Sequence, residues 1–264
     1  MDRFEGKVGF VTGGGTGIGL ACAKAIVDGG GKVVIAGRRE SQLQAAVQEL
    51  GPSASYAVCD VSRDADVDAA LAQVRERHGA LHLAVNSAGR GGAGNVLNTT
   101  VADFEAVLQT NLTGAFRSMR AEAKLMKASG GGSIVNISSD AGSHTIRWLT
   151  AYCVSKAGLE MLTRCAADDL GEYNIRVNAV APGLVPTDLS VGLTSSDETV
   201  AEYLRRMPIS RLGRVEDVAN AAAYLLSDEA SWVTGVVLPT DGGHHLRQGA
   251  DFSQRLRAML PEER

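Results

Sequence analysis

The alternation of short β-branched runs with longer Ala- and Leu-rich segments constrains this chain most strongly. The short runs predict seven strands, at residues 8–12, 32–36, 55–60, 81–86, 132–138, 175–181 and 235–239, with helical segments between them. Strands that alternate with helices pair in parallel through right-handed crossovers. We therefore expect residues 1–264 to form one α/β domain, a doubly wound parallel sheet of about seven strands with helices on both faces.

A glycine-rich turn follows the first predicted strand. Residues 12–19 read Thr-Gly-Gly-Gly-Thr-Gly-Ile-Gly, and the composition of residues 20–27 predicts a helix that opens at this turn. The N-terminus of a helix presents unpaired N–H groups and the positive end of its dipole, and glycine lets the backbone approach a ligand closely. The pattern favours a nucleotide pyrophosphate site over a turn that only joins a strand to a helix.

Tyr152 and Lys156 lie four residues apart in a predicted helix and so share one face. A free phenol has a pKa of about 10, so proton exchange near neutrality needs a shift of roughly 3 units, or about 4 kcal/mol. A fixed neighbouring ammonium favours the phenolate and supplies a shift in that direction. A lone Tyr-x-x-x-Lys is common, so its context decides its meaning.

Further motifs supply that context. In order, the chain contains Thr12-Gly13-x-x-x-Gly17-x-Gly19, Asn86-Ser87-Ala88-Gly89, Asn111, Ser139, Tyr152-x-x-x-Lys156 and Pro182-Gly183. This series resembles that of the short-chain dehydrogenase/reductase family over nearly the whole chain. It differs from the extended branch of that family, which has Thr-Gly-x-x-Gly-x-x-Gly and a longer C-terminal substrate domain. The resemblance implies a Rossmann fold that binds a nicotinamide cofactor.

The resemblance also implies four catalytic residues. Tyr152 exchanges a proton with a carbonyl oxygen while hydride moves between the nicotinamide and the carbonyl carbon. Ser139 hydrogen-bonds that oxygen, whereas Ser138 points to the opposite face of the strand if the pleat continues. Lys156 also binds the nicotinamide ribose. Asn111 holds a water that links Lys156 to solvent, although an ordinary polar helix residue is the alternative.

The end of the second strand indicates which cofactor is preferred. An Asp or Glu there would bind the ribose diol of NAD, but Gly37 occupies the position and Arg38 and Arg39 follow it. A guanidinium binds a 2′-phosphate through charge-assisted hydrogen bonds, so we predict NADP(H) over NAD(H). The alternative is an exposed arginine pair at a helix start. Glu40 is a counter-signal that would favour NAD if its carboxylate reached the ribose.

The expected cofactor-binding residues fall at or just after the predicted strand ends, where ligands bind in such sheets. Asp60 and Val61 resemble the pair that holds the adenine, and Ser87 departs from the second Asn that the family often has, a change we interpret as tolerated. The full set is Gly13, Thr16, Gly17, Ile18, Gly19, Arg38, Arg39, Asp60, Val61, Asn86, Ala88, Gly89, Tyr152, Lys156, Pro182, Gly183, Val185 and Thr187.

Residues 184–214 are the expected substrate loop, and their composition predicts a lid over an apolar pocket. Apolar candidates are Leu189, Leu193, Tyr203, Leu204 and Met207, with His144 and Trp148 approaching from the other side. At least half of them are expected to be packing residues, because an amphipathic helix needs an apolar stripe. We expect an uncharged, moderately apolar ketone, aldehyde or secondary alcohol as substrate.

Two other functions stay open at this stage. Reduction of a 3-oxoacyl or enoyl thioester is disfavoured, because residues 168–172 are acidic and residues 128–132 contain no Arg or Lys to dock an acidic carrier protein. Lys124, Lys127 and Arg164 keep it possible. A non-catalytic NADP-binding sensor or scaffold usually loses a catalytic residue, and none is lost here.

Composition and the tail complete the expectations. A net charge of −4 and the absence of a leader or spanning segment predict a cytoplasmic protein that binds neither nucleic acid nor membrane. The cysteines are expected to be reduced, with Cys153 beside Tyr152 as a redox-sensitive position, and no metal site is expected. The family resemblance implies a homotetramer. Residues 244–264 extend past the last strand, either as an amphipathic tail that covers a neighbouring site or as a frayed end, with Leu246, Phe252, Leu256, Met259 and Leu260 as its apolar residues.

Overall fold

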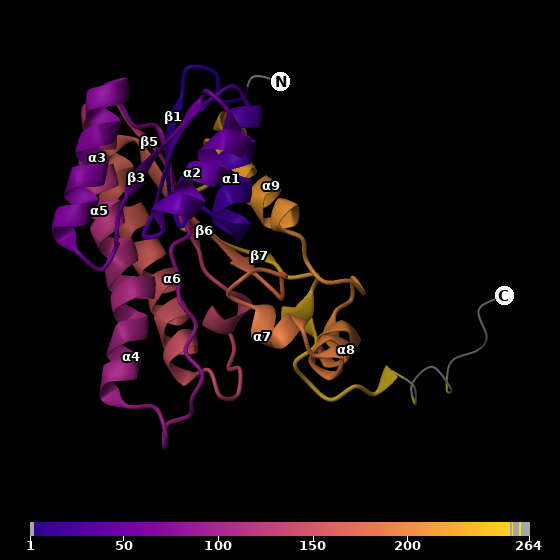
Figure 1. The fold of residues 1–264 in the computed structure, drawn as a ribbon. Coiled ribbons are helices and arrows are strands. Elements are labelled where there is room, and N and C mark those ends of the chain that lie inside the picture. The colour runs from indigo at the N-terminus through magenta and orange to yellow at the C-terminus, as the bar shows by residue number, and fades with distance from the viewer. Residues whose placement is uncertain (1–2, 254, 256–258, 260–264) are drawn as a thin grey trace.

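A seven-stranded parallel sheet forms the centre of the molecule, in the strand order β3-β2-β1-β4-β5-β6-β7 (Figure 1). The computed structural model describes residues 3–253, 255 and 259. The strands are β1 (Val8–Thr12), β2 (Lys32–Gly37), β3 (Ala54–Val58), β4 (Leu83–Asn86), β5 (Gly132–Ile137), β6 (Ile175–Pro182) and β7 (Val237–Thr240). The doubly wound α/β fold predicted from the alternating pattern is confirmed.

Helices cover both faces of this sheet. The long ones are α1 (Gly17–Asp28), α2 (Glu40–Leu50), α3 (Asp64–His78), α4 (Val101–Leu108), α5 (Gly114–Ala128), α6 (Thr150–Leu170), α8 (Asp197–Arg206) and α9 (Val215–Leu226). Short elements are α7 (Val191–Thr194), the π-helical turn η1 (Gln109–Thr113) and the 3-10 turns η2 (Asp140–Gly142), η3 (Gly171–Tyr173), η4 (Asp228–Ala230) and η5 (His244–Leu246). No helix in the described part of the chain is long and apolar enough to cross a membrane.

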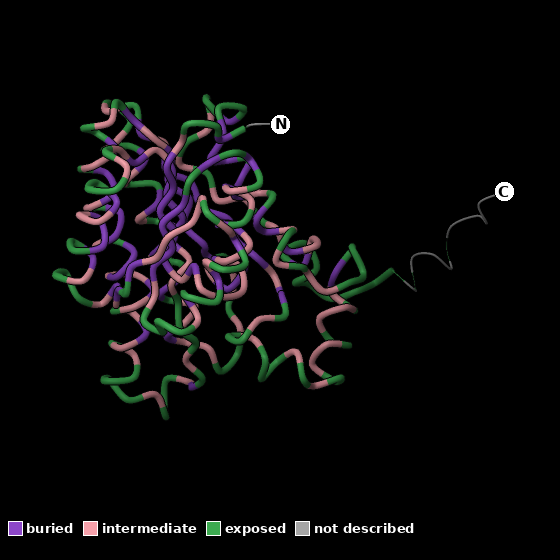
Figure 2. The backbone as a smooth tube through the Cα atoms, turned by 45° about the horizontal axis from the view of Figure 1, so that its top comes forward, coloured by how far each residue is buried: buried purple, intermediate pink, exposed green. Residues whose placement is uncertain are grey.

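Two apolar layers follow from the period-2 alternation of the strands. Val11 of β1 packs with α1, α2 and α9 on one face, whereas Phe10 packs with α3, α5 and α6 on the other. Both side chains are completely buried, and the buried backbone of the central strands runs between the two layers (Figure 2). Because the central strands are covered on both faces, they read as nearly continuous apolar runs.

The observed strands begin and end within two residues of the predicted limits, and the differences have local causes. β7 begins at Val237 instead of residue 235, because Gly235 has a φ of 74°, which an extended strand excludes. β3 ends at Val58, two residues before Asp60. Asp60 is instead held in a turn, where its carboxylate accepts hydrogen bonds from the backbone and hydroxyl of Ser62.

The strand order brings the candidate motifs together at the carboxyl ends of the central strands. β1 lies between β2 and β4, so the chain winds in opposite directions on its two sides, and ligands bind at such a reversal. Thr12 pairs in register with Asn86, and Asn86 with Asn136, so the segments that follow β1, β4 and β5 leave the sheet side by side. Figure 1 shows α7 and α8 beyond the same ends of β6 and β7.

Candidate active site

The glycine turn after β1 packs so closely on its neighbours that side chains are excluded from it. Gly13 and Gly17 have φ angles of 67° and 56°, which favour glycine. A Cβ added to Gly13 would lie 2.8 Å from the backbone nitrogen of Ala88, and one added to Gly19 would collide with the carbonyl oxygen of Gly13. Thr16, at the N-cap of α1, makes no side-chain capping bond within the described chain. The first backbone N–H groups of α1 therefore face a cradle that fits a pyrophosphate.

The segment after β6 closes against this turn. A Cβ added to Gly17 would lie 3.3 Å from Cγ2 of Thr187, so the two candidate cofactor-binding segments touch. Ser190 fixes the shape of the segment: its hydroxyl donates to the Val185 carbonyl at 2.6 Å and accepts from the Thr187 N–H at 2.9 Å. At the start of the segment, a Cβ on Gly183 would lie 2.9 Å from Asp241.

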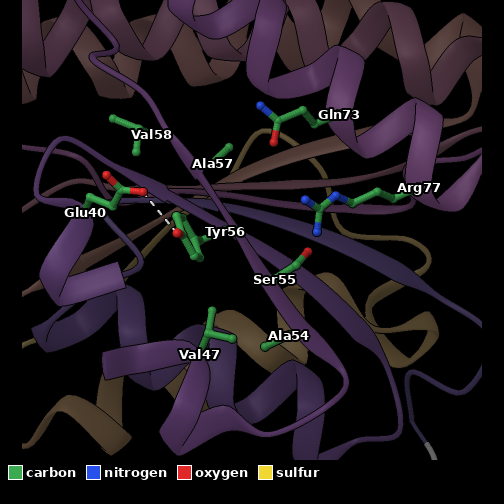
Figure 3. A pocket seen from close by; sticks show the side chains of 9 residues that line it. All are labelled: Glu40, Val47, Ala54, Ser55, Tyr56, Ala57, Val58, Gln73 and Arg77. Atoms are coloured by element: carbon green, nitrogen blue, oxygen red, sulfur yellow. Dashed lines mark hydrogen bonds between the residues drawn. The ribbon is translucent and has the colours of Figure 1, made fainter. Parts of the chain in front are cut away.

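The cationic end of β2 lies on the outer side of the glycine turn. Arg38 and Arg39 are both exposed, and a guanidinium nitrogen of Arg39 lies 3.8 Å from a carboxylate oxygen of Asp188 in the substrate loop. Glu40 is held elsewhere, because its carboxylate accepts a hydrogen bond of 3.0 Å from the Tyr56 hydroxyl. Figure 3 shows both side chains in the hollow along β3. Glu40, whose carboxylate would favour NAD if it reached the ribose, is thus bonded to the edge strand β3.

Asp60 lies near Arg38. Burial acts to raise the pKa of its carboxyl, but the hydrogen bonds from Ser62 and the charge of Arg38 bring that pKa below its ordinary value. Asp60 therefore presents a carboxylate at neutral pH. Its own N–H donates to Asp66 at 3.1 Å, which fixes the turn in which the adenine contact is expected.

The side chain of Asn86 does not point toward the glycine turn. It is 4% exposed, and its amide donates to Glu122 and to Asn136, each at 3.1 Å. Asn136 in turn donates to Thr163, at 2.9 Å. The side chain of Asn86 therefore joins β4 and β5 to α5 and α6, and only its backbone is left to support the cofactor.

Glu122 is a buried carboxyl that sequence reasoning missed. It is completely buried on α5, and burial raises its pKa to about 8. Its spacing on α5 is that of the buried stripe, and a glutamate there gives no signal of its own because most glutamates are exposed.

The two serines after β5 have separate partners. The Ser138 hydroxyl donates to Glu160 at 3.1 Å. The Ser139 hydroxyl donates to the carboxylate of Asp140 at 3.0 Å and accepts from the Ala141 N–H, and it is near enough to Tyr152 to act on the pKa of that phenol. Of the two, Ser139 is the one beside the candidate acid.

Tyr152 and Lys156 share one face of α6, with Nζ of Lys156 5.6 Å from the centre of the Tyr152 ring. Nζ donates to the carbonyl of Ile137 at 2.7 Å. Burial raises the pKa of Tyr152 to about 12, against the hydrogen bond from Ser139, and burial lowers the pKa of Lys156 to about 8. From the spacing of the two residues, the ammonium is predicted to lower the tyrosine pKa. The structure shows the opposite direction, because desolvation dominates.

This correction affects which form of the tyrosine is present. With a raised pKa, Tyr152 is a neutral phenol near neutral pH, and a neutral phenol is the form that gives a proton to an oxygen on which negative charge develops. Lys156, 5% exposed, is the nearest cationic side chain on the same helix face. The pair can therefore supply a proton and a stabilising charge at one point.

Asn111 lies in the π-helical turn between α4 and α5 and is 1% exposed. Its amide donates to the carbonyl of Arg90 and to the hydroxyl of Ser155, both at 3.0 Å, and its oxygen accepts from the Arg90 N–H at 2.8 Å. The side chain thus clamps the segment after Gly89 to α6, one residue before Lys156. π turns are frequent at functional sites.

A second group of side chains, which no sequence motif indicates, adjoins Ser139. The other carboxylate oxygen of Asp140 lies 3.0 Å from Nδ1 of His244. The His244 ring stacks on Tyr203 of the substrate loop, with centres 5.0 Å apart, and lies 5.5 Å from the His144 ring. His244 is 104 positions from Asp140, so only the fold brings them together.

The apolar candidates of the substrate loop differ widely in exposure, and only Met207 among them is buried. Met207 is 2% exposed, whereas Leu189 is 53% and Leu193 37% exposed. α7 and α8 contain no buried residue in the structure as described. In the tail, Leu246, Phe252 and Met259 are exposed, and Leu256 and Leu260 lie outside the described residues.

Comparisons with known proteins agree on a family. Residues 13–245 match the family model described as enoyl-(acyl carrier protein) reductase. The chain is 37% identical over 243 residues to a 3alpha-hydroxysteroid dehydrogenase of Mediterraneibacter gnavus, which covers 90% of this chain and 96% of that protein.

Solved structures are similar over almost the whole chain. A short-chain type dehydrogenase/reductase from Mycobacterium ulcerans superimposes with a TM-score of 0.90 at 40% identity, covering 97% of this chain and 95% of the other. A gluconate 5-dehydrogenase from Burkholderia cenocepacia, in complex with NADP and tartrate, gives a TM-score of 0.87 at 33% identity, covering 92% and 97%.

Proposed function

The chain belongs to the short-chain dehydrogenase/reductase family of oxidoreductases, and we propose that it interconverts a carbonyl and an alcohol on a moderately apolar small molecule with NADP(H) as cofactor. The observation that carries the proposal is the convergence of Ser139, Tyr152 and Lys156 at the sheet edge that also holds the glycine turn. When bound, the nicotinamide supplies or accepts the hydride.

In this proposal, each side chain acts on the substrate oxygen in a defined way. Tyr152 gives its proton to that oxygen in reduction and takes it back in oxidation, and Ser139 orients the oxygen with a hydrogen bond. Lys156 stabilises the phenolate left after transfer, because its ammonium lies on the same helix face. Asn111 positions the segment around Arg90 and the start of α6.

NADP(H) preference is supported by charge at the end of β2. Arg38 and Arg39 are exposed, and Glu40 is bonded to Tyr56. A 2′-phosphate bound there would replace the weak pairing of Arg39 with Asp188, whose atoms are 3.8 Å apart. The neighbouring structure in complex with NADP supports the same preference by similarity.

An apolar substrate is supported by the exposed leucines of the loop and by the similarity to a hydroxysteroid dehydrogenase. Reduction of an enoyl thioester is the second candidate, because the matching family model carries that description. The two reactions differ in the carbon that receives the hydride.

A homotetramer forms part of the proposal. Phe116 on α5 is 47% exposed, and Val154 and Met161 on α6 are 45% and 57% exposed, so apolar side chains of both helices face outward. Exposed apolar patches favour association between copies of a chain. Light scattering tests this expectation, and a monomer at working concentration contradicts it.

A panel of substrates with purified protein tests the function. NADPH oxidation is followed with ring ketones, diketones, aromatic aldehydes, and 3-oxoacyl and enoyl thioesters, and each active acceptor is repeated with NADH. Faster turnover of a carbonyl with NADPH supports the proposal. Turnover of enoyl thioesters alone supports the second candidate, and a preference for NADH contradicts the roles of Arg38 and Arg39.

A further inference from the structure

Three side chains next to the candidate acid form a compact set of metal-ligand types. Asp140, His144 and His244 each direct one ligand atom so that all three atoms lie within 4.8 Å of one another. They come from three separate segments: η2 after β5, the loop after it, and η5 after β7. Asp140 and His244 are both buried, at 5% exposure each. The sequence predicted no metal site, because nothing along the chain links positions 140 and 244.

The donor set and spacing suit a transition metal. Two imidazoles and one carboxylate are a common protein ligand set for Zn²⁺, with metal–ligand bonds of about 2.0 Å, so two ligand atoms of a tetrahedral ion lie roughly 3.3 Å apart. Asp140 Oδ2 and His244 Nδ1 are 3.0 Å apart, close to that separation. All three ligand atoms lie within 4.8 Å of one another, so His144 needs a shift of at most about 1.5 Å to reach the same ligand spacing.

His144 is free to supply the third bond. Its Nε2 is buried and has no hydrogen-bond partner among the described residues, an arrangement that costs free energy unless a partner is provided. The residue lies in the irregular segment between η2 and α6, where small backbone movements are cheap. On the other side, Tyr203 stacks on the His244 ring and limits its rotation.

We propose that Asp140, His144 and His244 bind one divalent transition-metal ion, with Zn²⁺ as the best fit. Three protein ligands leave a fourth position of the tetrahedron for water or another oxygen ligand, as in open zinc sites. The second oxygen of Asp140 is the one that accepts from Ser139 in this structure, so the ion would lie one side chain away from the candidate serine. It would also link η5, after the last strand, to the segment that carries the catalytic residues.

Metal binding is measured directly. Protein without an affinity tag is treated with a chelator, dialysed against micromolar ZnCl₂, desalted and analysed by mass spectrometry of the metal. Cobalt(II), titrated into a second sample, reports on geometry, because a tetrahedral site with nitrogen and oxygen ligands gives strong visible absorption. We expect one Zn²⁺ per chain and a cobalt spectrum of tetrahedral intensity.

Variants identify the ligands. His144→Ala and His244→Ala are each expected to raise the metal dissociation constant by more than about 100-fold. Loss of a residue that only hydrogen-bonds a metal ligand already lowers metal affinity by about 10- to 100-fold, and loss of a ligand itself has a larger effect. His245→Gln is the matched control: the residue is adjacent, but its ring is bonded to Asp241 and not to the cluster. His144 is only half-buried, so its variant remains informative if His244→Ala fails to fold.

Thermal unfolding gives an independent readout. Zinc at 100 times its dissociation constant is expected to raise the Tm by roughly 5 °C in the wild type and in His245→Gln, and by less than about 1 °C in His144→Ala. The proposal is overturned if the wild type keeps less than about a tenth of an equivalent of zinc, or if His144→Ala binds zinc as tightly as the wild type does.

Discussion

The glycine turn of residues 12–19 and the substrate loop of residues 184–214 touch through Gly17 and Thr187, yet they obey different constraints. In the turn, an added Cβ collides with backbone at Gly13 and at Gly19. In the loop, a Cβ on Gly192 meets no described atom within 4 Å, and α7 and α8 bury no residue among those described. The turn is fixed by the close approach of backbone to backbone. In α7 and α8, side chains can change at little cost to folding, whereas Leu184, Val185 and Met207 of the same loop are buried. Exposed positions of this kind suit a region that selects the substrate.

The largest expected effect lies between the two regions, at Tyr152. Replacing it by phenylalanine removes the proton that the substrate oxygen receives, and we expect turnover to fall by about 10³-fold or more while NADPH binding stays within about twofold. Steady-state rates and fluorescence titration of the cofactor measure both quantities. Tyr173→Phe, at a tyrosine that packs under Lys127, is the control and keeps wild-type turnover. A Tyr152→Phe enzyme with a tenth of the wild-type rate would exclude tyrosine as the acid.

Alanine at two glycines compares the regions directly. Gly19→Ala puts a methyl group against the Gly13 carbonyl and is expected to weaken NADPH binding by about 100-fold or to prevent folding. Gly192→Ala, in α7, meets open space and is expected to change neither NADPH binding nor Tm. Calorimetric titration and thermal unfolding of both variants provide the comparison. Equal effects would mean that the turn is no more constrained than the loop.

Cofactor preference is expected to depend on the arginines after β2 and not on an arginine of the substrate loop. Arg38→Ala and Arg39→Ala are each expected to raise the KM for NADPH by about tenfold or more, the value of a charge-assisted hydrogen bond, and to leave the KM for NADH within about twofold. Arg205→Ala removes an arginine of α8 that pairs with Glu202 and serves as the control. If the ratio of the KM for NADPH to the KM for NADH does not change in either variant, the arginines do not bind the 2′-phosphate.

The buried carboxyl of Glu122 makes the stability of the fold depend on pH. Burial raises its pKa from 4.5 to about 8, so the folded chain keeps a proton that the unfolded chain has lost. The contribution of Glu122 to the free energy of unfolding is therefore fully present below about pH 4.5 and is lost as the pH rises toward 8. Glu122→Gln is expected to reduce the fall in Tm between pH 5 and pH 8, by an amount equivalent to about 4 kcal/mol, from roughly 3 pH units at about 1.4 kcal/mol each. Thermal unfolding across this range checks it, with exposed Glu49→Gln as control. Parallel curves for wild type and Glu122→Gln would contradict the buried proton.

The smallest effect is expected in the substrate loop. Leu189→Ala and Leu193→Ala remove exposed apolar groups and should raise the KM for an apolar ketone about fivefold, without changing NADPH binding or Tm. Kinetics with two ketones of different size measure this change, and Val58→Ala, at an exposed valine of the edge strand β3, is the control. A loss of Tm comparable to that in Gly19→Ala would show that the loop is part of the core.

The fold could be predicted from the sequence because its signals are local. β-branched runs separated by helical segments, with a glycine turn after the first of them, place seven strands to within two residues. Ser139, Tyr152 and Lys156 could be proposed because the ordered motifs resemble those of the short-chain dehydrogenase/reductase family, since a serine at a strand end or a lone Tyr-x-x-x-Lys is common.

Other features of the site depend on long-range contacts and on solvent exclusion. The contact of Asp140 with His244 spans 104 positions, and Glu122 meets Asn86 only because α5 packs on β4. The direction of the Tyr152 pKa depends on how deeply the fold buries the ring, which spacing along a helix does not reveal.

The most direct test of the central claim follows one hydrogen atom. NADPH carrying deuterium at C4 of the nicotinamide, in each of its two configurations, is supplied with an accepted ketone, and the product is analysed by mass spectrometry and NMR. The account predicts one deuterium on the carbinol carbon from one of the two cofactor forms and none from the other. Deuterium on the β carbon of a conjugated ketone whose carbonyl stays intact, or none from either form, would contradict carbonyl reduction by this chain.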